Sequence, residues 1–74
     1  MDGQNLKQKR LTAGIPARLL ASRAGVDRAR LSELERGYAE ASDEELERLN
    51  DALRALKEAR ERVARVAAEV GWPF

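Results

Sequence analysis

Apolar residues recur along the chain at spacings of three and four, the period of one face of an α-helix, and no run alternates as a β-strand would. In the first half, glycine and proline interrupt this pattern at Gly14, Pro16, Gly25 and Gly37. Both residues disfavour the interior of a helix, so the interruptions mark helix ends. They predict three short helices, over residues 5–13, 16–24 and 28–36. The fold class is therefore predicted to be all-α.

The predicted helix starts carry side chains suited to capping. We expect Asn5 to cap the first helix and Asp27 the third, because short polar side chains accept hydrogen bonds from free backbone N–H groups there. Ser42 and Glu45 have the spacing of a capping box. No glycine or proline follows until Gly71, so one helix of about 28 residues, roughly 42 Å long, is predicted over 43–70.

A chain of 74 residues is long enough for one domain with a small core. It has no cysteine and no histidine, which argues against disulfides, thiol nucleophiles and the usual zinc sites. No glycine-rich phosphate loop or evident pair of pocket carboxylates points to catalysis. We therefore expect no enzyme, metal, cofactor or small-molecule ligand. No apolar run suits a signal peptide or the ~20 residues that span a bilayer, so we expect a cytoplasmic, nucleoid-associated protein and no membrane partner.

The charge is unevenly distributed although the net charge is only +1. Residues 1–36 hold eight basic and four acidic residues, a net +4, whereas residues 37–74 hold six and nine, a net −3. Such asymmetry favours a nucleic-acid partner for the first part, although ordinary solvated helix surfaces would give the same pattern.

Residues 17–36 have the features of two short helices that cross closely. Ala21 is small enough for a close crossing, and Gly25 can adopt the left-handed backbone of the turn. Leu31 and Leu34 define the buried face of the second helix. The opposite face mixes groups that suit base edges and phosphates: Arg28, Ala29, Ser32, Glu33 and Arg36.

Residues 6–56 resemble the Cro and phage-repressor family, also called the xenobiotic-response-element family. The segments that carry the resemblance are Leu6-Lys-Gln-Lys-Arg-Leu11, Leu20-Ala21, Ala24-Gly25-Val26 and Leu31-Ser-Glu-Leu-Glu-Arg-Gly37. The resemblance implies a repressor-like domain of five helices, or of four plus one long C-terminal helix, with a helix-turn-helix. It also implies base contacts from the recognition helix by Arg28, Ala29, Ser32 and Glu33.

The family pattern also implies phosphate contacts and a structural ion pair. The expected phosphate contacts are Lys7, Lys9, Ala17 through its backbone N–H, Arg18, Arg36 and Tyr38. Two positions depart from the family: Pro16-Ala17 replaces the usual capping residue and glutamine, and Glu40 would repel a phosphate. Arg10 and Glu35 match a partly buried ion pair, with two solvated surface charges as the alternative.

The C-terminal part exceeds what the family requires. We expect residues 1–56 to form the DNA-binding domain and residues 57–74 to form a helical extension that dimerises. The predicted dimer interface consists of Ala59, Val63, Val66, Ala67, Val70 and Trp72. Small, uncharged flanking positions favour antiparallel packing over a parallel zipper. The alternative is that this apolar stripe folds back on its own domain.

Together these features predict a sequence-specific double-stranded DNA-binding protein, a small transcriptional repressor acting as a homodimer. Two copies would read a pseudo-palindromic operator with half-sites about 34 Å apart. The alternative is an antitoxin or protein-interaction adaptor with the same fold, which the acidic loop and the missing glutamine favour.

Overall fold

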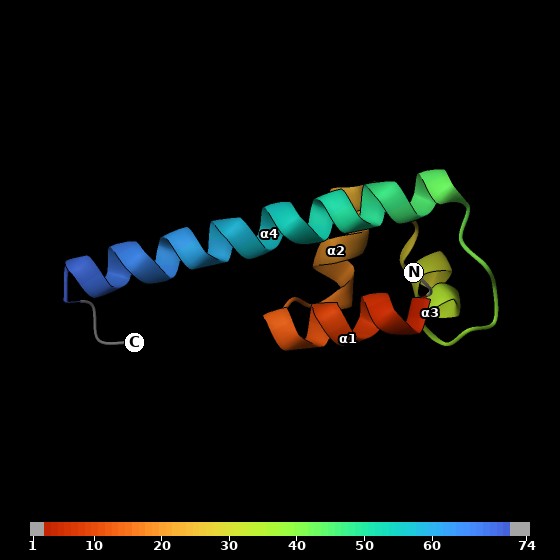
Figure 1. The fold of residues 1–74 in the computed structure, drawn as a ribbon, viewed down its shortest axis with the longest axis horizontal. Helices are drawn as coiled ribbons and strands as arrows, with labels where there is room; N and C mark the ends of the chain where they lie inside the picture. The colour runs from red at the N-terminus through yellow and green to blue at the C-terminus, as the bar shows by residue number, and fades with distance from the viewer. Residues whose placement is uncertain (1–2, 72–74) are drawn as a thin grey trace.

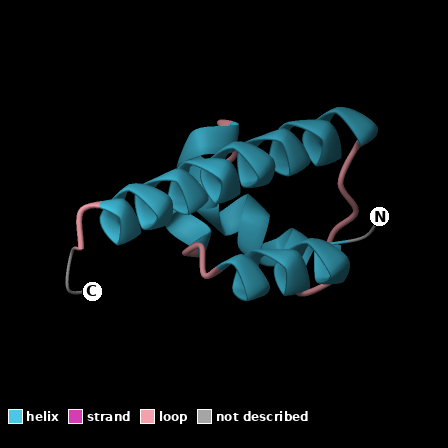
Figure 2. Ribbon diagram, turned by 60° about the vertical axis from the view of Figure 1, so that its left-hand side comes forward, coloured by secondary structure: helices cyan, strands magenta, loops and turns pink. Residues whose placement is uncertain are grey.

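The computed structural model describes residues 3–71, and within this range the chain forms four helices and no strand. They are α1 (Gly3–Ala13), α2 (Ala17–Ala24), α3 (Arg28–Glu35) and α4 (Asp43–Glu69). The first three form a compact group beside the N-terminal half of α4, whose C-terminal half extends beyond them (Figures 1 and 2). The all-α prediction is confirmed, and the long C-terminal helix is the fourth of the four.

Local backbone rules set the boundaries of α2 and α3. Gly25 ends α2 with a φ of 69°, and its N–H donates to Ala21 and Ser22 carbonyls. Asp27 caps α3 by accepting from the Ala29 N–H at 2.8 Å. Proline at the start of α2 lies outside the helix, because Pro16 is the extended residue that precedes Ala17. The third helix ends at Glu35, one residue earlier than predicted, with Arg36 as its C-cap.

The predicted start of the first helix was wrong. Helix α1 begins at Gly3, so Asn5 lies inside its first turn and does not cap it. Asparagine is a weak helix former, but it does not stop a helix. From the sequence alone, an asparagine inside the first turn of a helix cannot be distinguished from one that caps it.

Helix α4 begins with the predicted capping box. The Ser42 hydroxyl accepts from the Glu45 N–H, and the Glu45 carboxylate accepts from the Ser42 N–H, both at 3.1 Å. Asp43, Glu44 and Glu45 occupy its first turn, where the helix dipole favours negative charge. The helix then runs without interruption for 27 residues.

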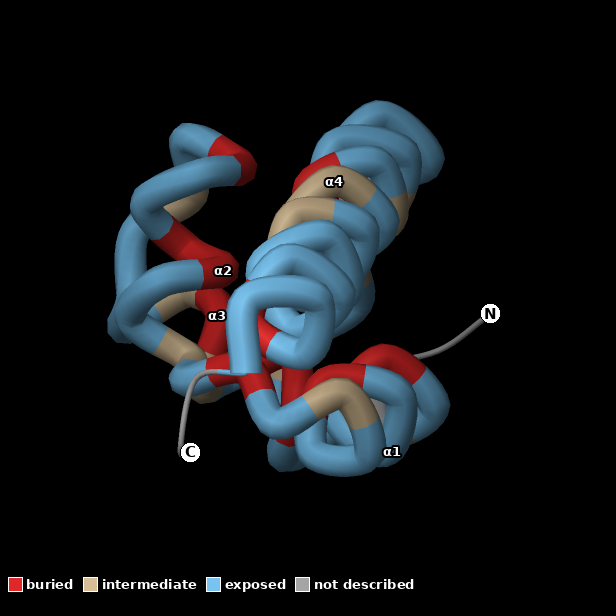
Figure 3. The backbone as a smooth tube through the Cα atoms, turned by 90° about the vertical axis from the view of Figure 1, so that its left-hand side faces the viewer, coloured by how far each residue is buried: buried red, intermediate tan, exposed pale blue. Residues whose placement is uncertain are grey.

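The core lies between the four helices, where their buried segments face one another (Figure 3). Five leucines are almost fully buried there: Leu6, Leu20, Leu31, Leu34 and Leu49. Ala21, Ala24 and Ala52 allow the crossing helices to approach closely, since small side chains keep the helix axes near one another. This core fixes which face of α3 is buried and which faces outward.

Arg60 links the middle of α4 to the rest of the domain. Its guanidinium donates to the Gly14 carbonyl at 2.7 Å and so ties α4 to the end of α1. Val63, Val66 and Val70 beyond it are 56–67% exposed, so these three residues do not fold back on the domain. Within residues 3–71, no helix is both long and apolar enough to cross a membrane.

Candidate nucleic-acid interface

The outward face of α3 carries all four residues predicted to contact bases. Arg28, Ala29 and Glu33 are exposed and Ser32 is half-buried, whereas Leu31, Leu34 and Glu35 on the other face are buried. The Asp27 cap holds the start of the helix beside Ala29. The face thus offers a guanidinium, a hydroxyl and a carboxylate, which can read donor and acceptor patterns of base edges.

A buried ion pair holds α3 against α1. Arg10 Nε donates to Glu35 Oε2 at 2.8 Å, and Arg10 NH2 donates to Glu35 Oε1 at 2.9 Å. Arg10 NH1 also donates to the Ile15 carbonyl at 3.0 Å. Both residues are more than nine-tenths buried. The two-bond geometry fixes rotation as well as distance, so it sets the direction in which the outer face of α3 points.

A second ion pair, which the sequence did not predict, ties α3 to the first turn of α4. Arg30 Nε and NH2 donate to the two carboxylate oxygens of Glu45 at 3.0 and 2.9 Å. Arg30 NH2 also donates to the Glu40 carbonyl at 3.1 Å. The hydrogen bonds from Arg30, followed by that from the Ser42 N–H, lower the pKa of Glu45 to about 2. The partners lie 15 residues apart, and the capping box had already accounted for Glu45, so no sequence signal indicated this pair.

The start of α2 presents backbone donors close to a basic side chain. The first hydrogen bonds of α2 are donated to the Pro16 carbonyl by Leu19 and Leu20. The N–H groups of Ala17 and Arg18 come before those of Leu19 and Leu20. At the start of a helix such N–H groups have no carbonyl acceptor within the helix. Ala17 is half-buried and Arg18 is exposed. Such a helix start suits a phosphate.

Three predicted phosphate-binding residues lie around one groove. Lys7 of α1, Arg36 at the end of α3 and Tyr38 of the following loop line it, and the rest of the lining consists of Asn5, Gln8, Leu11 and the ion-paired Glu35. Tyr38 is 76% exposed. The structure thus brings a lysine, an arginine and a phenol together beside α3.

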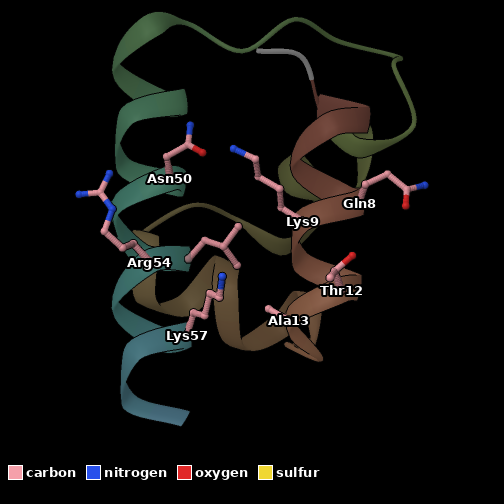
Figure 4. A pocket seen from close by; sticks show the side chains of 8 residues that line it. Gln8, Lys9, Thr12, Ala13, Asn50, Arg54 and Lys57 are labelled. Carbon is pink, nitrogen blue, oxygen red and sulfur yellow. The ribbon is translucent and has the colours of Figure 1, made fainter. Parts of the chain in front are cut away.

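Lys9 lies in a different groove, between α1 and α4. It projects from α1 toward α4, and Lys57 projects from α4 into the same space (Figure 4). Lys7 and Lys9 are two residues apart on a helix, which places them about 200° apart around its axis. The structure therefore separates Lys9 from the groove of Lys7, Arg36 and Tyr38.

Comparison with known proteins gives one match. Residues 6–59 match the sequence profile of a family described as helix-turn-helix, of the Cro/C1 type. The chain belongs to this helix-turn-helix family. The family is a DNA-binding regulatory one, and α2 and α3 are its helix-turn-helix in this chain. No curated protein and no solved structure matches the chain.

Four of the residues predicted for a dimer interface lie on the C-terminal half of α4 and Val70 caps its end; only Ala59 falls within the helix-turn-helix match. Ala59 is half-buried and Ala67 is 9% exposed, whereas Val63, Val66 and Val70 are exposed. Trp72 lies outside the described residues. The stripe therefore includes three valines that are accessible to a partner.

Proposed function

We propose that this helix-turn-helix protein binds a specific double-stranded DNA sequence as a homodimer and represses transcription from a pseudo-palindromic operator. The observation that carries the proposal is the outward face of α3, held by the Arg10–Glu35 pair on one side and the Arg30–Glu45 pair on the other. A reading surface fixed in two places loses little conformational entropy on binding. Action on DNA would place the protein in the cytoplasm, at the nucleoid.

Base reading is assigned to α3 and phosphate binding to its surroundings. Arg28 would donate to a guanine and Glu33 would accept from a cytosine amino group, with Ala29 and Ser32 against neighbouring bases. Lys7, Arg36 and Tyr38 would hold one stretch of backbone, and the N–H of Ala17 with Arg18 would hold another. Lys9 would contact a phosphate only if the DNA path reached the groove between α1 and α4.

Selection from random DNA, followed by affinity measurements, tests the assignment of the base readers. Arg28→Ala and Glu33→Ala should each weaken the cognate site by about 1–3 kcal/mol and relax the preference at one position. Arg54→Ala and Glu47→Ala are matched controls, because they remove the same charges from exposed positions of α4. Unchanged affinity and preference in both α3 variants would show that α3 does not read bases.

The salt dependence of binding tests the phosphate contacts. Lys7→Ala should weaken binding to every sequence and reduce the slope of log affinity against log salt by about one. Lys57→Ala removes the same charge from the groove between α1 and α4 and should leave the slope almost unchanged. Equal effects of the two variants would mean that the lysines act only through net charge.

An antitoxin or adaptor that binds protein is the second candidate. Glu40 favours it, because this exposed carboxylate follows Tyr38 in the loop and would repel a phosphate there. A chain that selects no DNA sequence, but binds a protein encoded beside its own gene, would support this function and exclude the first.

A further inference from the structure

The C-terminal part of α4 from Ala59 onward, here called the free half, carries an apolar stripe on one side. Ala59, Val63, Val66 and Val70 lie within about 60° of one another around the helix axis, at 100° per residue. Ala52 lies on the same side but is only 6% exposed. The end of α2 covers that region, where Arg23 and Ala24 line a shallow groove with Ala52 and Ala55.

This covering by α2 restricts how a second copy could pack on the stripe. A parallel partner helix would continue toward the start of α4 along the side that α2 occupies. An antiparallel partner needs only the free half, because its own domain lies beyond the end of the first helix. The structure therefore favours an antiparallel pair of α4 helices.

One antiparallel register covers the whole stripe, with an alanine opposite a valine at each end and valines opposite valines in the middle. It places Ala59 opposite Val70 of the second copy and Val63 opposite Val66, with the symmetric contacts repeated across a two-fold axis. Arg62 and Glu69 border the stripe on one side, and this register brings Arg62 within reach of the second copy's Glu69. On the other side, the positions nearest the stripe are Ala67, which is only 9% exposed, and Arg60, whose guanidinium donates to the Gly14 carbonyl.

We propose that two copies pair through α4 in this antiparallel register, and that the operator half-sites lie about two turns of DNA apart. This rests on the proposed DNA-binding function. The two-fold axis passes between residues 64 and 65, and the Arg30–Glu45 pair fixes α3 near residue 45. At about 1.5 Å per residue, the two copies of α3 lie about 60 Å apart along the helices. For DNA that runs parallel to the paired helices, this is nearer two turns, about 68 Å, than the one turn, about 34 Å, expected from the sequence.

Cysteine cross-linking of the full chain tests the register, because the chain has no cysteine of its own. The double variant with Ala59→Cys and Val70→Cys should form a covalent dimer with a short bismaleimide. Each single variant should form none, since like positions lie about 16 Å apart in this register. Ala68→Cys, on the opposite side of the helix, is the control. Cross-linking of the single variants, as a parallel pair requires, or none in the double variant, would overturn the register.

A charge exchange provides a second test of the pairing. Arg62→Glu or Glu69→Arg alone should weaken dimerisation in sedimentation at least several-fold, and the two together should restore it. Glu61→Arg, on the side away from the stripe, should have little effect. If the double variant dimerises no better than the single ones, Arg62 and Glu69 do not meet.

The operator spacing is read from the selected DNA. Half-sites centred about 18–20 base pairs apart support the proposal, and half-sites about 10 base pairs apart overturn it while leaving the DNA-binding function intact. A chain that cross-links in the expected pattern but selects no DNA would overturn the proposed function and the spacing, and would leave the antiparallel register standing.

Discussion

The Arg10–Glu35 pair allows a quantitative test of how α3 is held. Glu35→Leu removes the carboxylate and leaves the Arg10 guanidinium buried, with the Ile15 carbonyl as its remaining acceptor. Breaking one side of a buried ion pair in this way costs about 3–5 kcal/mol, because the remaining charge loses its partner but not its desolvation. A domain of this length has roughly 4–11 kcal/mol of stability in total. The variant should therefore lose at least about a quarter of the stability of the domain.

Replacing both partners distinguishes the destabilisation caused by an unpaired buried charge from the net contribution of the ion pair to stability. The double variant with Arg10→Met and Glu35→Leu fills the same space with apolar side chains and leaves no buried charge. Such replacements are often neutral or stabilising, so it should recover most of the lost stability. Arg48→Ala is the surface control: it breaks an exposed pair with Glu44 and should cost only about 0.3–0.5 kcal/mol.

Urea unfolding followed by circular dichroism at 222 nm measures all three variants. A Glu35→Leu variant that loses no more stability than Arg48→Ala, or a double variant less stable than Glu35→Leu, would contradict this account of the buried pair. A double variant that is stable but selects DNA less sharply would show that the pair serves the orientation of α3 more than the stability of the fold.

Two further predictions concern α4 and the turn. The folded-state pKa of Glu45, lowered from its usual 4.5 to about 2, contributes stability that is present above pH 4.5 and is lost as the pH falls toward 2. Glu45→Gln should reduce this acid dependence of the urea midpoint, and an unchanged acid profile would contradict the role of the Arg30–Glu45 pair. At Gly25, where φ is +69° and no neighbouring atom lies within 4 Å of an added Cβ, alanine should cost about 1–2 kcal/mol through the backbone alone. Gly25→Asn should cost less, and a loss for asparagine as large as that for alanine would argue against a purely conformational cause.

Features that depend on a few neighbouring residues could be predicted from the sequence. The left-handed turn at Gly25, the Asp27 cap and the Ser42–Glu45 capping box each involve residues no more than four positions apart. The division of α3 into buried and outward faces follows from the spacing of Leu31 and Leu34 in the same way. The false cap at Asn5 shows the limit, since a cap and an early helix residue can have the same side chain.

Contacts between distant parts of the chain were decided by the tertiary structure. Residues 15 positions apart form the Arg30–Glu45 pair, and residues 46 positions apart join Arg60 to Gly14. A long polar side chain can reach many partners, so the periodicity and spacing of residues in the sequence do not show which partner it binds. The groove that Lys9 lines likewise depends on where α4 lies, which the pattern of α1 does not contain.

The C-terminal half of α4 combines both kinds of information. Its sequence alone determined that it is a helix with an apolar stripe, because helical period and the absence of glycine and proline are local properties. Whether that stripe packs on its own domain could be decided only in three dimensions. Because α4 is straight, its C-terminal half extends beyond the first three helices (Figure 1). Val63, Val66 and Val70 therefore remain exposed.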